Sequence, residues 1–226
     1  MKRVFCALLL SPVALLGQAG RGCQGVGVHE DRGTVFVQCA SGEALQIGAQ
    51  GQCSKPFLSR SGDYAFFLEG RPPERAEIGL AQRSKGWATE GLLMFPVAVD
   101  GRTSHEVLDY RPWNVGCGAW VLADYSATTF ILLRVRCEPR QVTKVCTASA
   151  ACELSSGPFK GDIVVLARVP APPGDPMGRV VQYVYQIVTP TGTLVRSIGE
   201  GRQRLRDFLG FDPDLWPPPT GAPEKK

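Results

Sequence analysis

Histidine is scarce in this chain: His29 and His105 are the only two among 226 residues. Imidazole is the commonest metal ligand and acid–base group, so this scarcity leaves few ways to build either kind of site. The segment His105–Asp109 has the spacing of a two-histidine zinc motif, but Asp109 stands where the second histidine is needed. We therefore expect neither a bound metal nor a cofactor.

Several other catalytic signatures are also missing. The sequence has no Gly-x-Ser-x-Gly elbow, no Cys-x-x-Cys pair and no glycine-rich phosphate loop with lysine. A nucleophilic pair of Cys53 or Cys117 with His105 stays open, because folding rather than adjacency assembles such pairs. The carboxylates that could serve glycan hydrolysis are Asp100, Glu106, Asp109 and Asp124. An envelope hydrolase acting on glycan or peptide is thus the alternative function.

The chain also lacks a long basic run and an apolar run of membrane-spanning length. Its formal charge of +4 is spread out, so nucleic acid is not expected as a partner. The N-terminal apolar run Val4–Leu16 is shorter than the roughly 20 residues of a spanning helix. Lysine and arginine precede this run and small residues follow it, which is typical of a secretory signal peptide over residues 1–19.

A cleaved signal peptide predicts an exported protein, periplasmic or secreted, with no stable membrane span after cleavage. Lipid attachment at Cys23 is the alternative localisation. The charged Arg21 stands close before that cysteine, where lipoproteins carry small residues, so the sequence fits acylation poorly.

Cysteine is one of the features that are present. Cleavage would remove Cys6 and leave seven cysteines, and an oxidising compartment favours up to three disulfides among them. The disulfide candidates are Cys117 with Cys137, Cys23 with Cys39, and the remaining Cys146 and Cys152. Because seven is odd, one thiol stays free, and Cys53 in the polar stretch 50–54 is the candidate.

The segment between Cys117 and Cys137 is predicted to be a hairpin. We place its arms at Ala119–Leu122 and Thr128–Arg136 and its turn at Ala123–Ser126. A disulfide closes this hairpin only if the register brings the two Cα atoms to about 4.4–6.8 Å. The two arms are unequal with the turn in this place, which leaves the register open.

Strand-length alternating runs recur along the chain, separated by many of its 26 glycines and 18 prolines. The predicted strands outside the hairpin are Thr34–Cys39, Ala44–Ile47, Tyr64–Glu69, Ala76–Gln82, Gly91–Val99, Ile163–Val169, Val180–Val188 and Thr193–Ile198. Helical spacing predicts short helices over 140–154 and 201–209. The fold class is therefore mainly β: an antiparallel sandwich or barrel-like sheets with one or two short helices, supported by disulfides.

Composition divides the chain after the signal peptide into three parts. Residues 20–154 form a β-rich region with the disulfides, and 155–211 form a hairpin plus a short helix that can belong to the same domain. Residues 212–226 are a proline-rich extended tail.

Trp87, Trp113 and Trp120 are the candidate binding aromatics, able to stack on a ligand or anchor a partner, unless they are buried in the core. The missing catalytic signatures, the moderate charge and the strand-rich pattern favour an exported, non-catalytic binding or assembly module. Its expected partner is another envelope or extracellular protein.

Overall fold

The computed structural model describes residues 22–70, 76–126 and 129–217. The predicted signal peptide, residues 1–19, lies outside this part of the chain. The described part is mainly β, with antiparallel sheets, one short α-helix and two disulfides, which confirms the predicted fold class.

Three four-stranded antiparallel sheets make up most of the described residues. Their strands are β4 (Cys53–Leu58), β5 (Tyr64–Glu69), β6 (Glu77–Gln82) and β7 (Ala88–Met94); β10 (Val107–Pro112), β11 (Gly118–Ser126), β12 (Thr129–Arg136) and β13 (Gln141–Thr147); and β14 (Ala150–Glu153), β15 (Ile163–Pro170), β16 (Val181–Val188) and β17 (Leu194–Gly199). In each sheet every strand pairs with the next along the chain.

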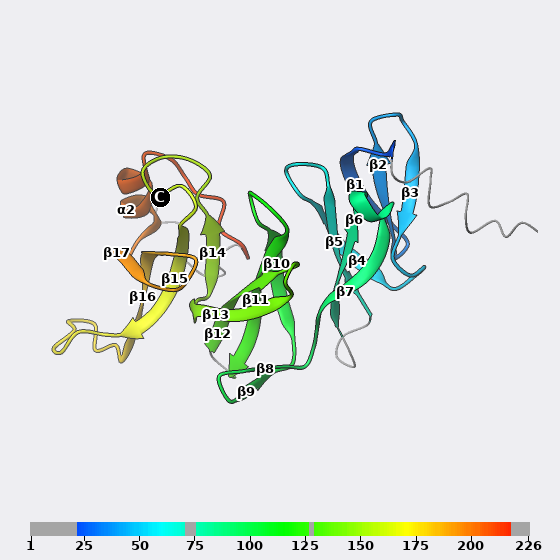
Figure 1. Ribbon diagram of the computed structural model, residues 1–226. Coiled ribbons are helices and arrows are strands. Elements are labelled where there is room, and N and C mark those ends of the chain that lie inside the picture. The colour runs from blue at the N-terminus through cyan, green and yellow to red at the C-terminus, as the bar shows by residue number, and fades with distance from the viewer. Residues whose placement is uncertain (1–21, 71–75, 127–128, 218–226) are drawn as a thin grey trace, which may run out of the picture.

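Smaller elements complete the fold. They are a three-stranded sheet of β1 (Gly25–Asp31), β2 (Thr34–Cys39) and β3 (Ala44–Ile47), the hairpin β8 (Val97–Val99) and β9 (Arg102–Ser104), the 3-10 turn η1 (Arg83–Lys85) and the helix α2 (Arg202–Leu209). The sheets stand side by side in chain order, with α2 beyond the last one (Figure 1). Consecutive four-stranded meanders stacked in this way have the architecture of β-propeller blades.

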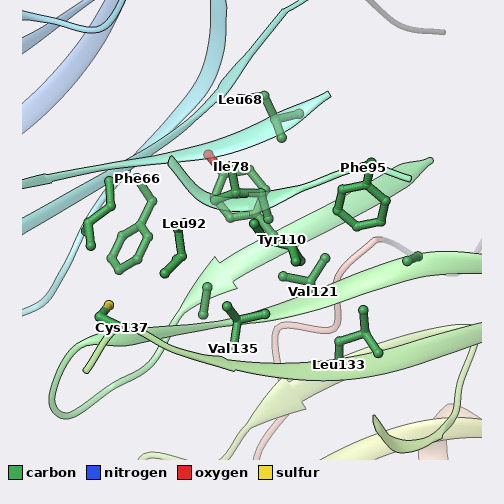
Figure 2. Close-up of a cluster of buried hydrophobic side chains, with 14 of the residues drawn as sticks. Phe66, Leu68, Ile78, Leu92, Phe95, Tyr110, Val121, Leu133, Val135 and Cys137 are labelled. Carbon is green, nitrogen blue, oxygen red and sulfur yellow. The ribbon is translucent and has the colours of Figure 1, made fainter. Parts of the chain in front are cut away.

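The strands between two neighbouring sheets are apolar on both faces, and their alternate residues enter different cores. On β11, Val121 packs toward the β4–β7 sheet, whereas its neighbour Leu122 packs toward the β14–β17 sheet. Figure 2 shows the first of these cores, where Phe66 and Ile78 face Val121 and Leu133. The β10–β13 sheet is thus held in place by apolar side chains buried against the neighbouring sheet on each of its faces.

The two ends of the row are covered differently. On the last sheet, Ile187 of β16 and Leu205 of α2 belong to one buried cluster, so the helix covers this apolar face. On the first sheet, Val35 and Val37 point inward, while His29 stacks on Phe36 at 5.3 Å between ring centroids. The exposed His29 lies at the outer end of the row.

Both leading disulfide predictions are confirmed. Cys23 bonds Cys39 with 5.0 Å between their Cα atoms, and Cys117 bonds Cys137 with 5.5 Å. The Cys23 sulfur is the atom that lipid attachment would require, so the lipid-anchor alternative is wrong. Disulfides persist in oxidising surroundings, and these two indicate an extracytoplasmic environment.

The hairpin's turn was predicted in the wrong place. Ala123–Ser126 belong to β11, which runs on until Ser126 lies opposite Thr129. The Asp124 carboxylate, which resembles a turn residue in the sequence, accepts the backbone N–H of His105 at 2.7 Å and of Glu106 at 2.8 Å. The arms therefore differ by a single residue, nine in β11 and eight in β12, and their register brings the two cysteines together at the open end.

The helix predicted over 140–154 is also wrong, because this segment forms β13 and β14. In β13, Lys144 pairs with Leu133 and Cys146 with Leu132, which leaves Val145 as an extra residue in a bulge. A bulge breaks two-residue alternation, and here it produced spacings of three and four that imitate a helix. The second predicted helix is confirmed as α2.

Cys146 and Cys152 lie on β13 and β14, in different sheets, and both are free. The prediction that they are disulfide-bonded is therefore wrong. Cys53 is free as predicted, although it is the buried first residue of β4 rather than part of a polar loop.

Candidate functional site

A concave pocket of about 560 Å³ lies where three sheets and the C-terminal segment meet. It is lined from the end of β4, from β10 and the turn after it, from β11 and β14, and from residues 211–216. The lining includes the side chains of Arg60, Arg111, Trp113, Trp120, Glu153 and Trp216. Its volume is within the range of ordinary ligand sites.

The C-terminal segment forms one wall of this pocket. Trp216 is 5% exposed, and its backbone makes two hydrogen bonds of 2.9 Å with Ala151 of β14. Leu215 is buried as well. The tail predicted from residue 212 therefore begins as a packed, paired segment, and its residues 218–226 lie outside the described part.

Two of the predicted binding aromatics meet in the pocket. The ring centroids of Trp113 and Trp120 are 5.7 Å apart, and the rings are tilted by 44°. The Trp120 indole N–H donates to Glu153 Oε2 at 2.7 Å, and the Asn114 backbone N–H donates to the same oxygen at 3.0 Å. Glu153 thereby ties β14 to the β10–β13 sheet.

The position of Trp113 depends on the absence of a side chain at Gly118. A Cβ at Gly118 would lie 2.5 Å from the Trp113 ring, closer than atoms can approach. The Arg134 guanidinium lies 4.8 Å from the centroid of the same ring, a cation–π distance. Trp113 is thus packed between β11 and β12, and its indole nitrogen has no hydrogen-bond partner in the described structure.

Arginines supply the positive charge of the pocket. Arg111 pairs with Asp109 at 2.9 Å, and its guanidinium lies 4.4 Å from the Phe57 ring centroid and 5.6 Å from that of Trp216. Arg60 is exposed, and it makes no ion pair within the described residues. The pocket therefore combines one fixed guanidinium with one that is available to a ligand.

Trp87, the third predicted binding aromatic, lies elsewhere. It is 4% exposed in the core between the first two sheets, and its indole N–H donates to the Cys23 carbonyl at 3.0 Å. The indole is thus part of the packing beside the Cys23–Cys39 disulfide, and Trp87 does not line the pocket.

The residues of the alternative Cys–His pair are not brought together in the pocket. Cys117 is disulfide-bonded, and desolvation raises the pKa of the Cys53 thiol to about 11. Burial likewise raises the pKa of Cys146 and of Cys152, each to about 11. His105 is exposed between β9 and β10 and is not part of the pocket wall.

The candidate carboxylates are engaged in separate places. Asp100 pairs with Lys144 at 3.0 Å, Asp109 pairs with Arg111, and Asp124 accepts backbone N–H groups. Across residues 22–217, apart from the two undescribed gaps, no three His, Cys, Asp or Glu residues are grouped to hold a metal ion. None of the helices in these ranges is long and apolar enough to cross a membrane.

Sequence reasoning missed Arg111, Glu153 and Trp216. They come from β10, β14 and the C-terminal segment, and no local motif connects them. For Trp216, the only signal in the sequence was a tryptophan immediately before a run of prolines.

No protein-family model and no curated protein matches the sequence. Among solved structures, dipeptidyl peptidase 4 from Porphyromonas gingivalis is similar with a TM-score of 0.51 and 8% identity, over 77% of this chain and 31% of that one. An uncharacterized protein from Listeria monocytogenes EGD-e has a TM-score of 0.43 and 9% identity, over 76% of this chain and 49% of that one. TolB from Acinetobacter baumannii has a TM-score of 0.30 and 12% identity, over 74% of this chain and 49% of that one. At such identities the likeness to dipeptidyl peptidase 4 concerns the fold alone.

Proposed function

We propose that this protein is an exported, non-catalytic binding module that holds a segment of a partner protein in the pocket around Trp113 and Trp120. The observation that carries the proposal is the convergence of three tryptophans and two arginines on one concave surface. Tryptophan and arginine are enriched among the residues that dominate the energy of protein–protein binding. The expected partner is another protein of the envelope or the extracellular space.

The rigidity of this pocket supports the proposal. Trp120 is held by Glu153, Arg111 by Asp109, and Trp216 by backbone pairing with Ala151. Side chains that are already ordered lose little conformational entropy on binding, so more of the contact energy remains as affinity. Arg60 is the exposed cation at this surface that a partner can engage.

Site-specific photo-crosslinking in cells that produce the protein tests the proposal. A photoreactive side chain at Ser155, an exposed residue of the pocket wall, should yield one defined protein adduct. The same group at Val180, which is 85% exposed on the β15–β16 loop, is the matched control and should not yield it.

Two variants then connect the adduct to the pocket. Trp113→Ala should abolish the Ser155 adduct, and Arg60→Ala should weaken it, because both remove groups from the pocket surface. Arg60 is exposed, so its variant tests the pocket without threatening the fold. Equal adducts at Ser155 and Val180, or none at either, would contradict the proposal.

A further inference from the structure

A second cavity, of about 360 Å³, lies between the β12–β13 edge and the turn that joins β16 to β17. Its lining residues are Arg134, Arg136, Gln141, Thr143, Lys144, Pro190 and Thr191. The lining includes three cationic residues, an amide and two hydroxyl groups, but no carboxylate. Hydrogen-bond donors therefore dominate its surface.

The strand register brings the key side chains onto one face. Arg134 lies opposite Thr143, and Arg136 lies opposite Gln141. Residues two apart on a strand point the same way and stand about 6.6 Å apart, at roughly 3.3 Å per residue. Both guanidinium groups can therefore reach a single small group placed between them.

The two arginines differ from the other cation of the cavity. Lys144 is neutralised by Asp100 at 3.0 Å and also lies 4.7 Å from the centroid of the Tyr125 ring. Neither Arg134 nor Arg136 has an ion-pair partner among the described residues, and the Arg134 Nε is buried without a hydrogen-bond partner. Two like charges share a cavity that supplies no counter-charge.

The opposite wall is set by close packing. A Cβ at Gly192 would lie 2.1 Å from the Val145 carbonyl oxygen, so the β16–β17 turn sits directly against β13. Thr191 on this turn is linked to Thr189 by a hydroxyl–hydroxyl hydrogen bond of 2.9 Å. The cavity is thus shaped before any ligand arrives, and its small volume suits a compact group.

We propose that this cavity binds a small soluble oxyanion, a phosphate or sulfate group, between Arg134 and Arg136. Guanidinium groups match the geometry of such anions through paired N–H donors, and these charge-assisted hydrogen bonds are among the strongest in proteins. A bound oxyanion would also supply the counter-charge that the lining of the cavity lacks.

Titration calorimetry of the folded protein with inorganic phosphate and with sulfate, at constant ionic strength in chloride buffer, tests the proposal. We expect saturable binding with one site per chain. Arg136→Gln should weaken binding at least tenfold, and Arg134→Gln should do the same. Arg136 gives the cleaner result, because Arg134 also packs on Trp113.

Arg140→Gln is the matched control. Arg140 lies at the turn of the same β12–β13 hairpin, its side chain is 53% exposed, and it lies 3.8 Å from Glu90, outside the cavity. This variant should bind phosphate as the unmodified protein does.

Three results would overturn the proposal: no saturable binding of either anion, unchanged binding in Arg136→Gln, or an equal loss in Arg140→Gln. Sedimentation with phosphatidylglycerol vesicles in the absence of any binding of inorganic phosphate would overturn it too, because the site would then recognise a surface and not a small anion.

Discussion

The two faces of the β10–β13 sheet are both apolar over much of their length but differ at one end. The face toward β4–β7 is apolar from end to end, formed by Ala119, Val121, Ala123, Ile131, Leu133, Val135 and Cys137. The face toward β14–β17 begins with Trp120, Leu122 and Leu132 but ends in Arg134 and Arg136. Both pockets border this second face. The first face therefore contributes mainly to stability, and the second carries the proposed binding sites.

The largest expected effect is on the apolar face. Leu133→Ala should lower the free energy of unfolding by about 4 kcal/mol, because it removes a fully buried side chain and leaves a cavity. Arg136→Gln, three residues along β12 on the other face, should change it by no more than about 0.5 kcal/mol. Chemical denaturation measures the unfolding free energy of both variants. An equal loss in Arg136→Gln and Leu133→Ala would show that the two faces contribute equally to stability.

The disulfide at the margin of the apolar face should come next. Replacing Cys117 and Cys137 together by alanine should cost about 3 kcal/mol, because the unfolded chain loses a cross-link between residues 20 apart in sequence. Denaturation of the double variant, compared with the oxidised parent, measures this cost. An unchanged denaturation midpoint would show that packing against the β4–β7 sheet is enough to hold the open end of the hairpin without the disulfide.

Gly118→Ala should act on the binding face. The new Cβ would force the Trp113 ring away, which we expect to cost about 2 kcal/mol and to abolish the partner adduct at Ser155. Gly27→Ala on β1 is the control, because its Cβ would lie 3.9 Å from the nearest atom. Retained crosslinking in Gly118→Ala would show that Trp113 is not needed for binding.

The smallest expected effect concerns the reactivity of the free thiols at neutral pH. Cys53, Cys146 and Cys152 have pKa values raised to about 11, so the folded protein keeps these thiols protonated and nearly unreactive at pH 7. Within residues 22–217, unfolding without reductant should expose three thiols, and reduction should add four; Cys6 adds one thiol in a chain that keeps residues 1–19. A chromogenic thiol reagent counts them, and a single thiol before reduction would support a third disulfide instead.

The same thiols predict how stability depends on alkaline pH. The unfolded chain loses these protons near pH 9, while the folded protein holds them until about pH 11. Deprotonation therefore favours the unfolded state across this window, and stability should fall as pH rises from 9 to 11. The slope of unfolding free energy against pH should lessen in Cys146→Ala, where one buried thiol is absent.

Strands with regular apolar spacing or clear turn residues at both ends were predictable from the sequence. β2 has the bounds that its alternating residues predict, and β5 has the bounds that the turn residues on either side of it predict. β4 was not predictable, since Pro56 and a register shift between Ser54 and Phe57 interrupt its pattern. In β13 the bulge at Val145 likewise interrupted the alternation, so this strand was not predicted either.

The candidate site was predictable only in part. Trp113 and Trp120 were named from the sequence because tryptophan is rare and often binds ligands or partners. Nothing in the sequence indicated that Trp87 would lie in the core while Trp216 reached the pocket. That difference depends on which sheets stand side by side, and this information belongs to the tertiary packing alone.

The pairing of Trp216 with Ala151 has a practical consequence for measurements. The described part of the chain ends one residue later, at Pro217, and nine residues, 218–226, follow it in the sequence. A fluorophore attached at residue 226 can stand at most about 30 Å from Pro217, since an extended chain covers up to about 3.5 Å per residue. Energy transfer to a labelled partner would therefore report occupancy directly.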